Sequence, residues 1–116
     1  MKHSVLPLVF SVMFVACASS VVHAQSNVDE LSSGAAAAVV LAWRCAPDDY
    51  PGVYRQALTE MLERLRLYDA TERALALESA ERKMKAFSIS SAEQPCEGLD
   101  KLRAFARTWG FAHFAR

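Results

Sequence analysis

The sequence predicts an all-α fold: a small four-helix array cross-linked by one disulfide, after an N-terminal signal peptide. Apolar residues recur at helical spacing in four segments, turn-forming residues separate those segments, and no stretch alternates with period two for long enough to argue a sheet. We expect a signal peptide over residues 1–24, one domain over residues 25–110 and a tail over residues 111–116, because the 92 residues after the signal are too few for two cores.

The predicted signal peptide has two alternative processing sites. A short basic start precedes an apolar run over residues 5–16, which has the length of a signal-peptide core and is too short to span a membrane. The tripeptide ending at Ala24 fits ordinary signal peptidase, which releases a free periplasmic protein. The four residues from Phe14 to Cys17 resemble a lipoprotein box, with Phe14 where Leu is usual. In that alternative the signal ends at residue 16, and a lipidated Cys17 anchors the protein at the periplasmic face of a bacterial outer membrane.

The first predicted helix is rich in alanine. Ser26 and Asp29 are spaced as a capping box, and the helix should end near Cys45 because Pro47 disfavours helical geometry at the residue before it. Small side chains allow a neighbouring helix to approach closely. The expected apolar face comprises Val28, Leu31, Ala35, Ala38, Val39 and Ala42.

This alanine-rich helix has too little bulk to fill a wide core, which favours an open groove between helices. Val40, Leu41 and Trp43 lie off its main face and are candidates for contact outside the domain. A groove between amphipathic helices commonly binds a partner helix. The residues that we expect to take part in this partner-binding groove are Leu41, Val53, Ala57 and Met84.

The second predicted helix has Pro51 in its first turn, with Asp49 or Tyr50 as cap, and runs to about residue 67. Its apolar residues recur at helical spacing: Val53, Ala57, Leu58, Met61, Leu62 and Leu65. The opposite face is charged and is expected to face solvent, with an ion pair between residues four apart, Glu60 and Arg64.

The third predicted helix begins at Ala70, because Asp69 and Glu72 are spaced as a capping box, and runs to about Phe87. Its expected buried stripe is Ala74, Leu77, Ala80 or Glu81, Met84 and Phe87. The basic cluster Arg82, Lys83 and Lys85 is expected near the C-terminal end, where cations complement the helix dipole.

The fourth predicted helix follows a capping box of Ser91 and Gln94 before Pro95, and Gly110 is expected to end it. Its stripe is Leu99, Leu102, Phe105, Ala106 and Trp109. The sequence after Trp109 is rich in aromatic residues. It either folds back as a lid over the core or forms an exposed patch.

Cys45 and Cys96 are the two cysteines of the processed chain, and an even pair in a small exported domain favours a disulfide. It would join the end of the first helix to the start of the fourth. A redox or metal pair is disfavoured, since the sequence has no CxxC motif and His113 is the one histidine after the signal.

The sequence offers no catalytic constellation, so we expect no enzyme activity, no metal and no cofactor. Asp48 and Asp49 form an acidic pair on a turn before a proline, where capping and turn formation explain them. Removal of Lys2 with the signal leaves 12 basic and 13 acidic residues, a net charge of −1. Such a balance gives no long-range field that would recruit nucleic acid or anionic lipid.

The residues around the first domain cysteine resemble the pilotins of the type II secretion system. The resemblance begins at Val28-Asp29-Glu30-Leu31-Ser32-Ser33, continues through the alanine-rich helix and includes Cys45-Ala46-Pro47-Asp48-Asp49-Tyr50-Pro51 followed by Arg55 and Ala57. In that family a cysteine is followed by an aspartate, an apolar residue and a proline, which Asp49-Tyr50-Pro51 matches with Tyr50 where Leu is more common. Cys96, Leu99 and Phe105 fit the second half more loosely, and the family's turn after the second helix is represented only by Leu67-Tyr68-Asp69.

This resemblance implies a small outer-membrane lipoprotein with a disulfide-locked four-helix fold. Such a protein binds the C-terminal segment of a secretin subunit and helps to target it to the outer membrane. The alternative function is a soluble periplasmic helical binding protein, such as an immunity protein that blocks a toxin through a loop like Asp48-Asp49-Tyr50.

Overall fold

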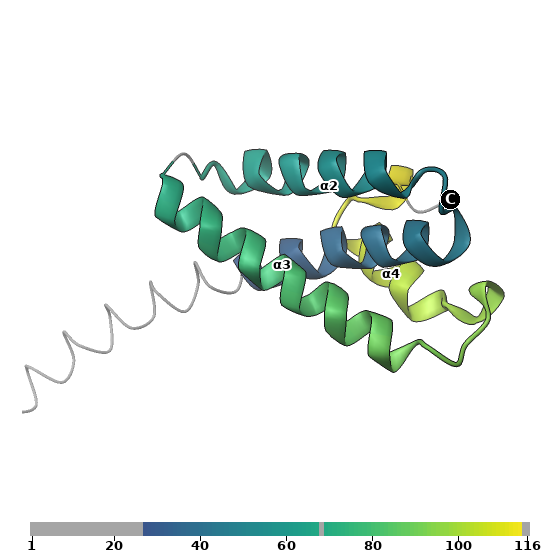
Figure 1. Cartoon of the computed structure of the whole chain (residues 1–116). Helices are drawn as coiled ribbons and strands as arrows, with labels where there is room; N and C mark the ends of the chain where they lie inside the picture. Colours follow the sequence, from purple (N-terminus) through teal and green to yellow (C-terminus); the bar gives the residue numbers. More distant parts are fainter. Residues whose placement is uncertain (1–26, 68, 115–116) are drawn as a thin grey trace, which may run out of the picture.

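The computed structural model describes residues 27–67 and 69–114, and every regular element within these ranges is helical. A first helix over residues 27–45 precedes α2 (Tyr50–Leu65), α3 (Ala70–Ser90), the 3-10 helix η1 (Cys96–Gly98), α4 (Asp100–Thr108) and the 3-10 helix η2 (Ala112–Phe114) (Figure 1). The prediction of an all-α, four-helix fold is confirmed. The signal peptide, Cys17 and Ser26 lie outside the described residues.

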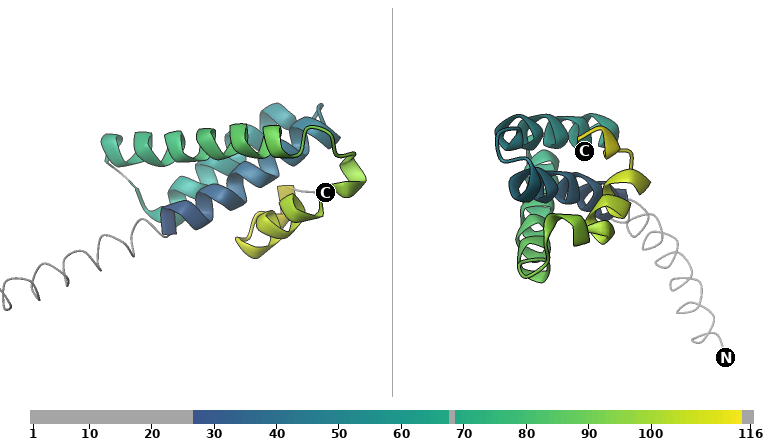
Figure 2. Two further views of the ribbon diagram at one scale, coloured as in Figure 1. Left: turned by 90° about the horizontal axis from the view of Figure 1, so that it is seen from below. Right: turned by 90° about the vertical axis from the view of Figure 1, so that its right-hand side faces the viewer.

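The first helix forms the centre of the fold. Eight consecutive residues, 35–42, are buried, so side chains all round the helix are covered by neighbours. α2 runs antiparallel to it, while α3 and α4 lie on opposite sides of it (Figure 2). Ala35 to Ala38 leave the backbone accessible to close approach, and this explains how three helices can surround one.

This arrangement corrects the expectation that Val40 and Leu41 contact something outside the domain. They are 2% and 4% exposed, whereas Trp43 is 52% exposed. We expected small side chains to leave space beside the first helix. The neighbouring helices approach closely enough to bury Val40 and Leu41, because an unfilled apolar cavity loses packing contacts, although surface hollows remain beside both residues.

α2 begins and ends at residues with clear backbone roles. Pro51 occupies the first turn, as predicted, and Asp49 precedes the helix without a side-chain capping hydrogen bond. Arg66 follows the helix in the left-handed conformation, with φ of 54°, and its N–H donates to the Glu63 carbonyl at 3.1 Å. The predicted Glu60–Arg64 pair is present at 3.0 Å.

α3 is capped as predicted. Asp69 accepts hydrogen bonds from the backbone N–H groups of Thr71 and Glu72, at 3.1 and 3.2 Å. The helix continues to Ser90, beyond the predicted end at Phe87. Its last turn holds no basic residue, so the expected position of the Arg82, Lys83 and Lys85 cluster at the helix end was wrong.

The buried stripe of α3 also differs from the prediction. Ala74 is exposed. The buried residues of this helix are mostly small: Ala76, Ser79, Ala80 and Met84. Ala80 and Met84 of the predicted stripe are buried, whereas Leu77 and Phe87 are only partly buried and Ala76 and Ser79 were not predicted. The alanine-rich first helix packs closely against small side chains, and Leu75 faces solvent with 60% exposure.

Ser91 is the C-cap residue of α3 and does not begin the fourth helix, so the predicted capping box with Gln94 was wrong. Its hydroxyl donates to the Phe87 carbonyl at 2.6 Å and accepts from Arg44 Nη1 at 3.2 Å. The side chain therefore closes the end of α3, and α4 begins only at Asp100.

The disulfide joins Cys45, at the end of the first helix, to Cys96 in η1, with a Cα–Cα distance of 5.7 Å. This is the predicted connection between the end of the first helix and the approach to the fourth. Arg103 Nη2 donates to the Cys96 carbonyl at 2.6 Å and so holds the same loop against α4.

The C-terminal segment, residues 109–114, folds back over the core. Gly110 ends α4 with φ of 84°, as a left-handed C-cap requires, and Phe111 is completely buried. A Cβ atom at Gly34 of the first helix would lie 2.7 Å from the Trp109 Cβ. Of the two alternatives for this aromatic sequence, the structure therefore shows the lid, and Phe111 belongs to the core.

Candidate partner-binding groove

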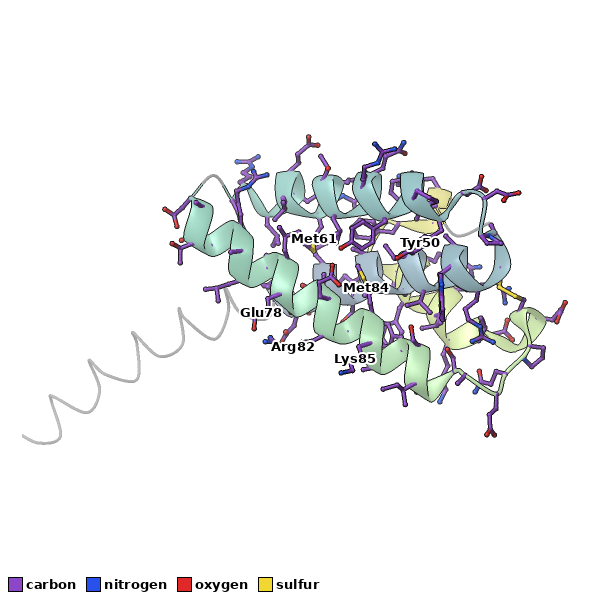
Figure 3. All side chains as sticks on the ribbon, in the orientation of Figure 1. Tyr50, Met61, Glu78, Arg82, Met84 and Lys85 are labelled. Carbon is purple, nitrogen blue, oxygen red and sulfur yellow. A yellow bond between two sulfur atoms is a disulfide. The ribbon has the colours of Figure 1, made fainter. Side chains whose placement is uncertain are left out.

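One apolar side of the first helix is open between α2 and α3. A hollow of about 260 Å³ is bounded there by three elements, and we call it the α2–α3 groove. Figure 3 shows Tyr50 and Met84 in the space between the two helices. The lining residues are Val39, Val40, Trp43, Tyr50, Tyr54, Glu81, Met84, Lys85 and Ser88.

The floor of the groove is apolar. Val39 and Val40 come from the central helix, and Met84 comes from α3; all three are buried by their neighbours. Trp43 lies one turn after Val39 and Val40 and is the large apolar side chain of the groove that remains half exposed. An exposed Trp beside a buried apolar floor is typical of a site that gains energy by covering it.

Two tyrosines form the α2 wall. Tyr50 and Tyr54 are one helical turn apart, with ring centroids 6.0 Å apart and an interplanar angle of 57°. The Tyr54 hydroxyl donates a hydrogen bond across the groove to Glu81 Oε1 on α3. This contact fixes one end of the groove, since it joins the helices that form its two walls.

The hydrogen bond also changes the acidity of the phenol. The pKa of Tyr54 is raised from 10.0 to about 12. The largest cause is the hydrogen bond from the phenol to the Glu81 carboxylate, followed by desolvation and by the negative charge of Glu81. Tyr54 is therefore a neutral hydrogen-bond donor throughout the physiological range. It serves as a structural donor in the groove and is a poor candidate for a proton-transfer group.

The α3 rim carries both charge signs. Glu81 and Lys85 are four residues apart, and Ser88 continues the same side of the helix. Aromatic walls, an apolar floor and a mixed polar rim suit the side chains of a peptide, which needs burial for its apolar residues and hydrogen-bond partners at the edges. The groove has no nucleophile with an adjacent base.

The four residues predicted for a partner-binding groove do not line one surface. Met84 lies in the α2–α3 groove. Leu41 and Val53 instead border a separate hollow of about 440 Å³, next to Asp48 and Asp49 and the C-terminal residues His113 and Phe114. Ala57 is completely buried in the core. A helical wheel places such residues on apolar faces but does not show which of those faces are covered by other helices.

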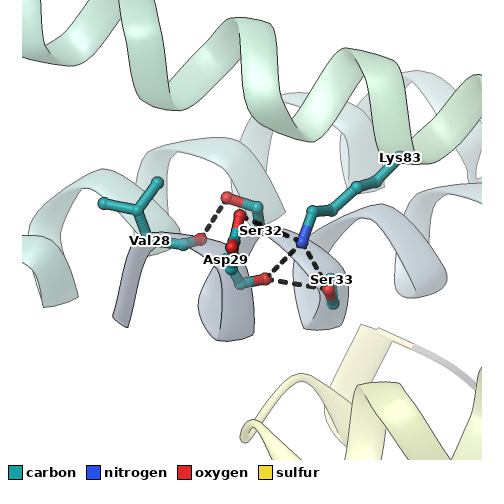
Figure 4. Close-up of polar contacts among 5 residues, drawn as sticks. All are labelled: Val28, Asp29, Ser32, Ser33 and Lys83. Carbon is teal, nitrogen blue, oxygen red and sulfur yellow. Dashed lines mark hydrogen bonds and ion pairs between the residues drawn. The ribbon is translucent and has the colours of Figure 1, made fainter. Parts of the chain in front are cut away.

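Lys83 is a functional side chain that sequence reasoning missed. Its Nζ donates to the Asp29 carbonyl at 2.7 Å and to Ser33 Oγ at 2.8 Å, and lies 3.5 Å from Asp29 Oδ1 (Figure 4). In the same region Ser32 donates to the Val28 carbonyl. Lys83 thereby fixes α3 to the beginning of the first helix. The sequence contains no local signal for this contact, because its partners lie some fifty positions away.

The sequence also did not predict that Arg44 and Arg64 bind distant backbone carbonyls. Arg44 Nη1 donates to the Ser91 carbonyl at 2.6 Å, and Arg44 Nη2 donates to the Gln94 carbonyl, so this arginine holds the loop between α3 and η1. Arg64 donates to the carbonyls of Trp109 and Gly110, each at 2.6 Å. Arg64 lies on the exposed face of α2, as predicted, and from there it donates to backbone carbonyls at the end of α4 that no helical hydrogen bond satisfies.

One carboxylate oxygen near this arginine is less well satisfied. Glu60 Oε2 is buried and accepts no hydrogen bond, although His113 Nε2 lies 3.2 Å away. The two atoms are close, but the contact is not aligned as a hydrogen bond.

Other types of site were also sought in the described ranges. Within residues 27–67 and 69–114, no three or more His, Cys, Asp or Glu side chains are grouped so that they could hold a metal ion. No helix in that part of the chain is both long enough and apolar enough to cross a membrane. The proposed lipidation residue, Cys17, lies outside the described residues.

Comparison with known proteins gave no match to any family model, curated protein or solved structure.

Proposed function

We propose that the processed chain is a non-catalytic, exported binding protein whose α2–α3 groove accepts an apolar, helix-forming segment of a partner protein. The observation that supports this proposal most is the combination of a buried apolar floor, Val39, Val40 and Met84, with the half-exposed Trp43 beside it. Such an arrangement gains free energy when a partner covers the tryptophan.

The dimensions of the groove favour a peptide side chain over a small organic ligand. Drug-sized ligands occupy pockets of roughly 300 to 1,000 Å³. The α2–α3 groove holds about 260 Å³, enough for one or two apolar side chains. An amphipathic helix presents such anchors three or four residues apart while its polar face remains in water.

The partner that we propose is the C-terminal segment of a secretin, as the resemblance to pilotins implies. A disordered tail that folds on binding loses conformational entropy and recovers the loss through buried apolar surface. Lipidation of Cys17 would add attachment to the outer membrane, and several acyl chains anchor a protein far more firmly than one. The protein would then escort its secretin partner to that membrane.

A second candidate function is toxin inhibition in the periplasm, and one observation favours it. Asp48 and Asp49 are exposed on the turn before α2, and Asp49 makes no capping hydrogen bond even though it is the N-cap residue. Both carboxylates therefore remain accessible to a basic partner surface. A secretin gene beside this gene would favour the first proposal, and an effector gene beside it would favour the second.

A peptide titration tests the groove. We expect a synthetic secretin C-terminal peptide to quench or shift Trp43 fluorescence, and Trp43→Ala to weaken binding, measured calorimetrically, by roughly 2 kcal/mol, as hot-spot aromatics do. Leu75→Ala is the matched control, because Leu75 is an exposed apolar residue of 60% exposure that lies outside the α2–α3 groove. Equal losses in the two variants, or no binding by the unmodified protein, would overturn the groove assignment.

Mass spectrometry of the processed N-terminus tests the membrane address separately. A lipidated Cys17 is expected for the anchored pilotin-like protein, whereas a chain that begins at Gln25 is a free periplasmic protein. Recovery of the Gln25 form alone would refute anchoring and leave the groove proposal to be decided by the peptide titration.

A further inference from the structure

We propose that the outward face of α4 binds the headgroup region of an anionic lipid bilayer. This face is opposite the helix side that buries Leu102 and Ala106 in the core. It contains an apolar hollow of about 460 Å³. The residues around that hollow, which we call the α4 face, are Lys101, Ala104, Phe105, Thr108 and Trp109.

The two aromatic residues of the α4 face are held in fixed positions. Phe105 is 41% exposed and stacks on Phe87 of α3, with ring centroids 5.6 Å apart and planes inclined by 20°. Trp109 is partly buried against Gly34, and its carbonyl accepts from Arg64. Phe105 and Trp109 are one turn apart, and aromatic rings of this kind are favoured at the level of lipid headgroups.

The charges of α4 complement an anionic surface. Lys101 is part of the α4 face, and Arg107 projects from its flank; both are exposed, and within the described residues neither makes an ion pair. Asp100, the acidic residue of this helix, is paired with Arg103 at 3.4 Å. Residues 101–114 contain no Asp or Glu. This local excess of positive charge is not visible in the whole-chain balance, and it attracts the phosphates of anionic lipids.

The location of the α4 face fits a membrane contact. Gly34 of the first helix packs directly against Trp109 of the α4 face. The first helix begins at residue 27, which is seven residues before Gly34 and about 10 Å away along the helix axis. A lipid anchor at Cys17, as in the proposed function, would be connected to the domain through residue 27, at the start of the same helix. α3 lies on the other side of the central helix from α4 (Figure 2), and no residue of α4 lines the α2–α3 groove, so a contact between α4 and a bilayer leaves the groove residues uncovered.

Vesicle flotation tests this inference without the lipid anchor. The protein is exported with Cys17→Ser and purified from the periplasm in its processed form, so that no acyl chain contributes. Its binding is measured to phosphatidylcholine vesicles and to vesicles of equal parts phosphatidylcholine and phosphatidylglycerol. A Trp43→Phe background isolates the fluorescence of Trp109, which should shift to shorter wavelength on binding.

We expect binding to the anionic vesicles that weakens as salt is raised, and little binding to phosphatidylcholine alone. The double variant Lys101→Gln/Arg107→Gln should bind roughly 25-fold more weakly, since each surface cation contributes about fivefold. The matched control is Arg55→Gln/Arg66→Gln, which removes two exposed cations, one in α2 and one at its C-cap, that make no ion pair in the described part of the chain and lie outside the α2–α3 groove. Failure to bind anionic vesicles, equal binding to both vesicle types, or an equal loss in the control would overturn the proposal. The secretin peptide titration, made on protein that retains Trp43, is independent of these results, because none of Lys101, Arg107, Arg55 and Arg66 lines the α2–α3 groove.

Discussion

The guanidinium of Arg64 lies over the ring of Phe111, with Cζ 4.4 Å from the ring centroid. The same group donates to the carbonyls of Trp109 and Gly110 and is paired with Glu60. One side chain of α2 therefore satisfies the end of α4 and covers the largest completely buried side chain of the domain. The C-terminal segment is held chiefly through this arginine.

Replacement of Arg64 should release the C-terminal segment. We expect Arg64→Ala to lower the free energy of unfolding by about 2 kcal/mol, because charged hydrogen bonds and the cation–π contact are lost. Arg64→Lys should recover only part of the loss, since an ammonium group cannot donate in the same planar fork. Urea unfolding measures both effects, and amide exchange at residues 109–114 locates them. Arg55→Ala, on the same helix, is the control; an equal effect there would refute the assigned role.

Gly34 and Gly52 should respond in opposite ways to alanine. A Cβ at Gly34 would lie 2.7 Å from Trp109 Cβ and 2.8 Å from Phe111 Cδ2, whereas a Cβ at Gly52 meets nothing within 4 Å. Gly34→Ala should destabilise the domain by about 1 to 3 kcal/mol through overpacking. Gly52→Ala should be neutral or stabilise it by up to about 1 kcal/mol through helix propensity. Thermal unfolding of both variants checks the pair, and a stabilising Gly34→Ala would contradict the close contact with Trp109.

Tyr54 should titrate well above an ordinary tyrosine. The fold favours its neutral form and raises its pKa from 10.0 to about 12, so this contribution to stability is present below pH 10 and is lost as the pH rises toward 12. Absorbance of tyrosinate follows the titration, and the difference from Tyr54→Phe isolates this residue. Glu81→Ala removes the acceptor and should lower the pKa toward 10. A pKa that does not change in Glu81→Ala would exclude the hydrogen bond as the cause.

Loss of the disulfide should destabilise the domain strongly. In the chain-entropy model, closure of a loop with a sequence separation of 51 contributes about 4 kcal/mol. We expect the Cys45→Ser/Cys96→Ser variant to unfold at much lower urea concentration than the oxidised protein. Loop contacts from Arg44 and Arg103 remain, so the reduced fold should stay helical in the absence of denaturant. Separate migration of the Cys45 and Cys96 peptides in a non-reducing digest would refute the bond itself.

The helices and the disulfide could be predicted from sequence because their signals are local or pairwise. Asp69 as a cap, Pro51 in a first turn and Gly110 as a helix end are each recognised from a few neighbouring residues. Cys45 and Cys96, the two cysteines after the predicted signal peptide, allow only one intrachain pairing. These features do not depend on how the helices pack.

The burial pattern was harder to predict, since it depends on which helix occupies the centre. Leu41 of the first helix and Ala57 of α2 have the spacing of groove residues, yet both are buried because neighbouring parts of the fold cover them. Ala74 and Ala76 are identical in type, and only packing decides that Ala76 is the buried one. Arg44, Arg64 and Lys83 bind carbonyl groups that are more than forty positions away, and sequence spacing contains no information on such contacts.

The central position of the first helix has a consequence for the order of events in the cell. Gly34 packs against Trp109 and Phe111, which follow it by more than 70 positions. The core therefore cannot close completely until residues 109–111 have been synthesised. For the exported protein that we propose, this late closure would favour transport of the chain before its core is complete.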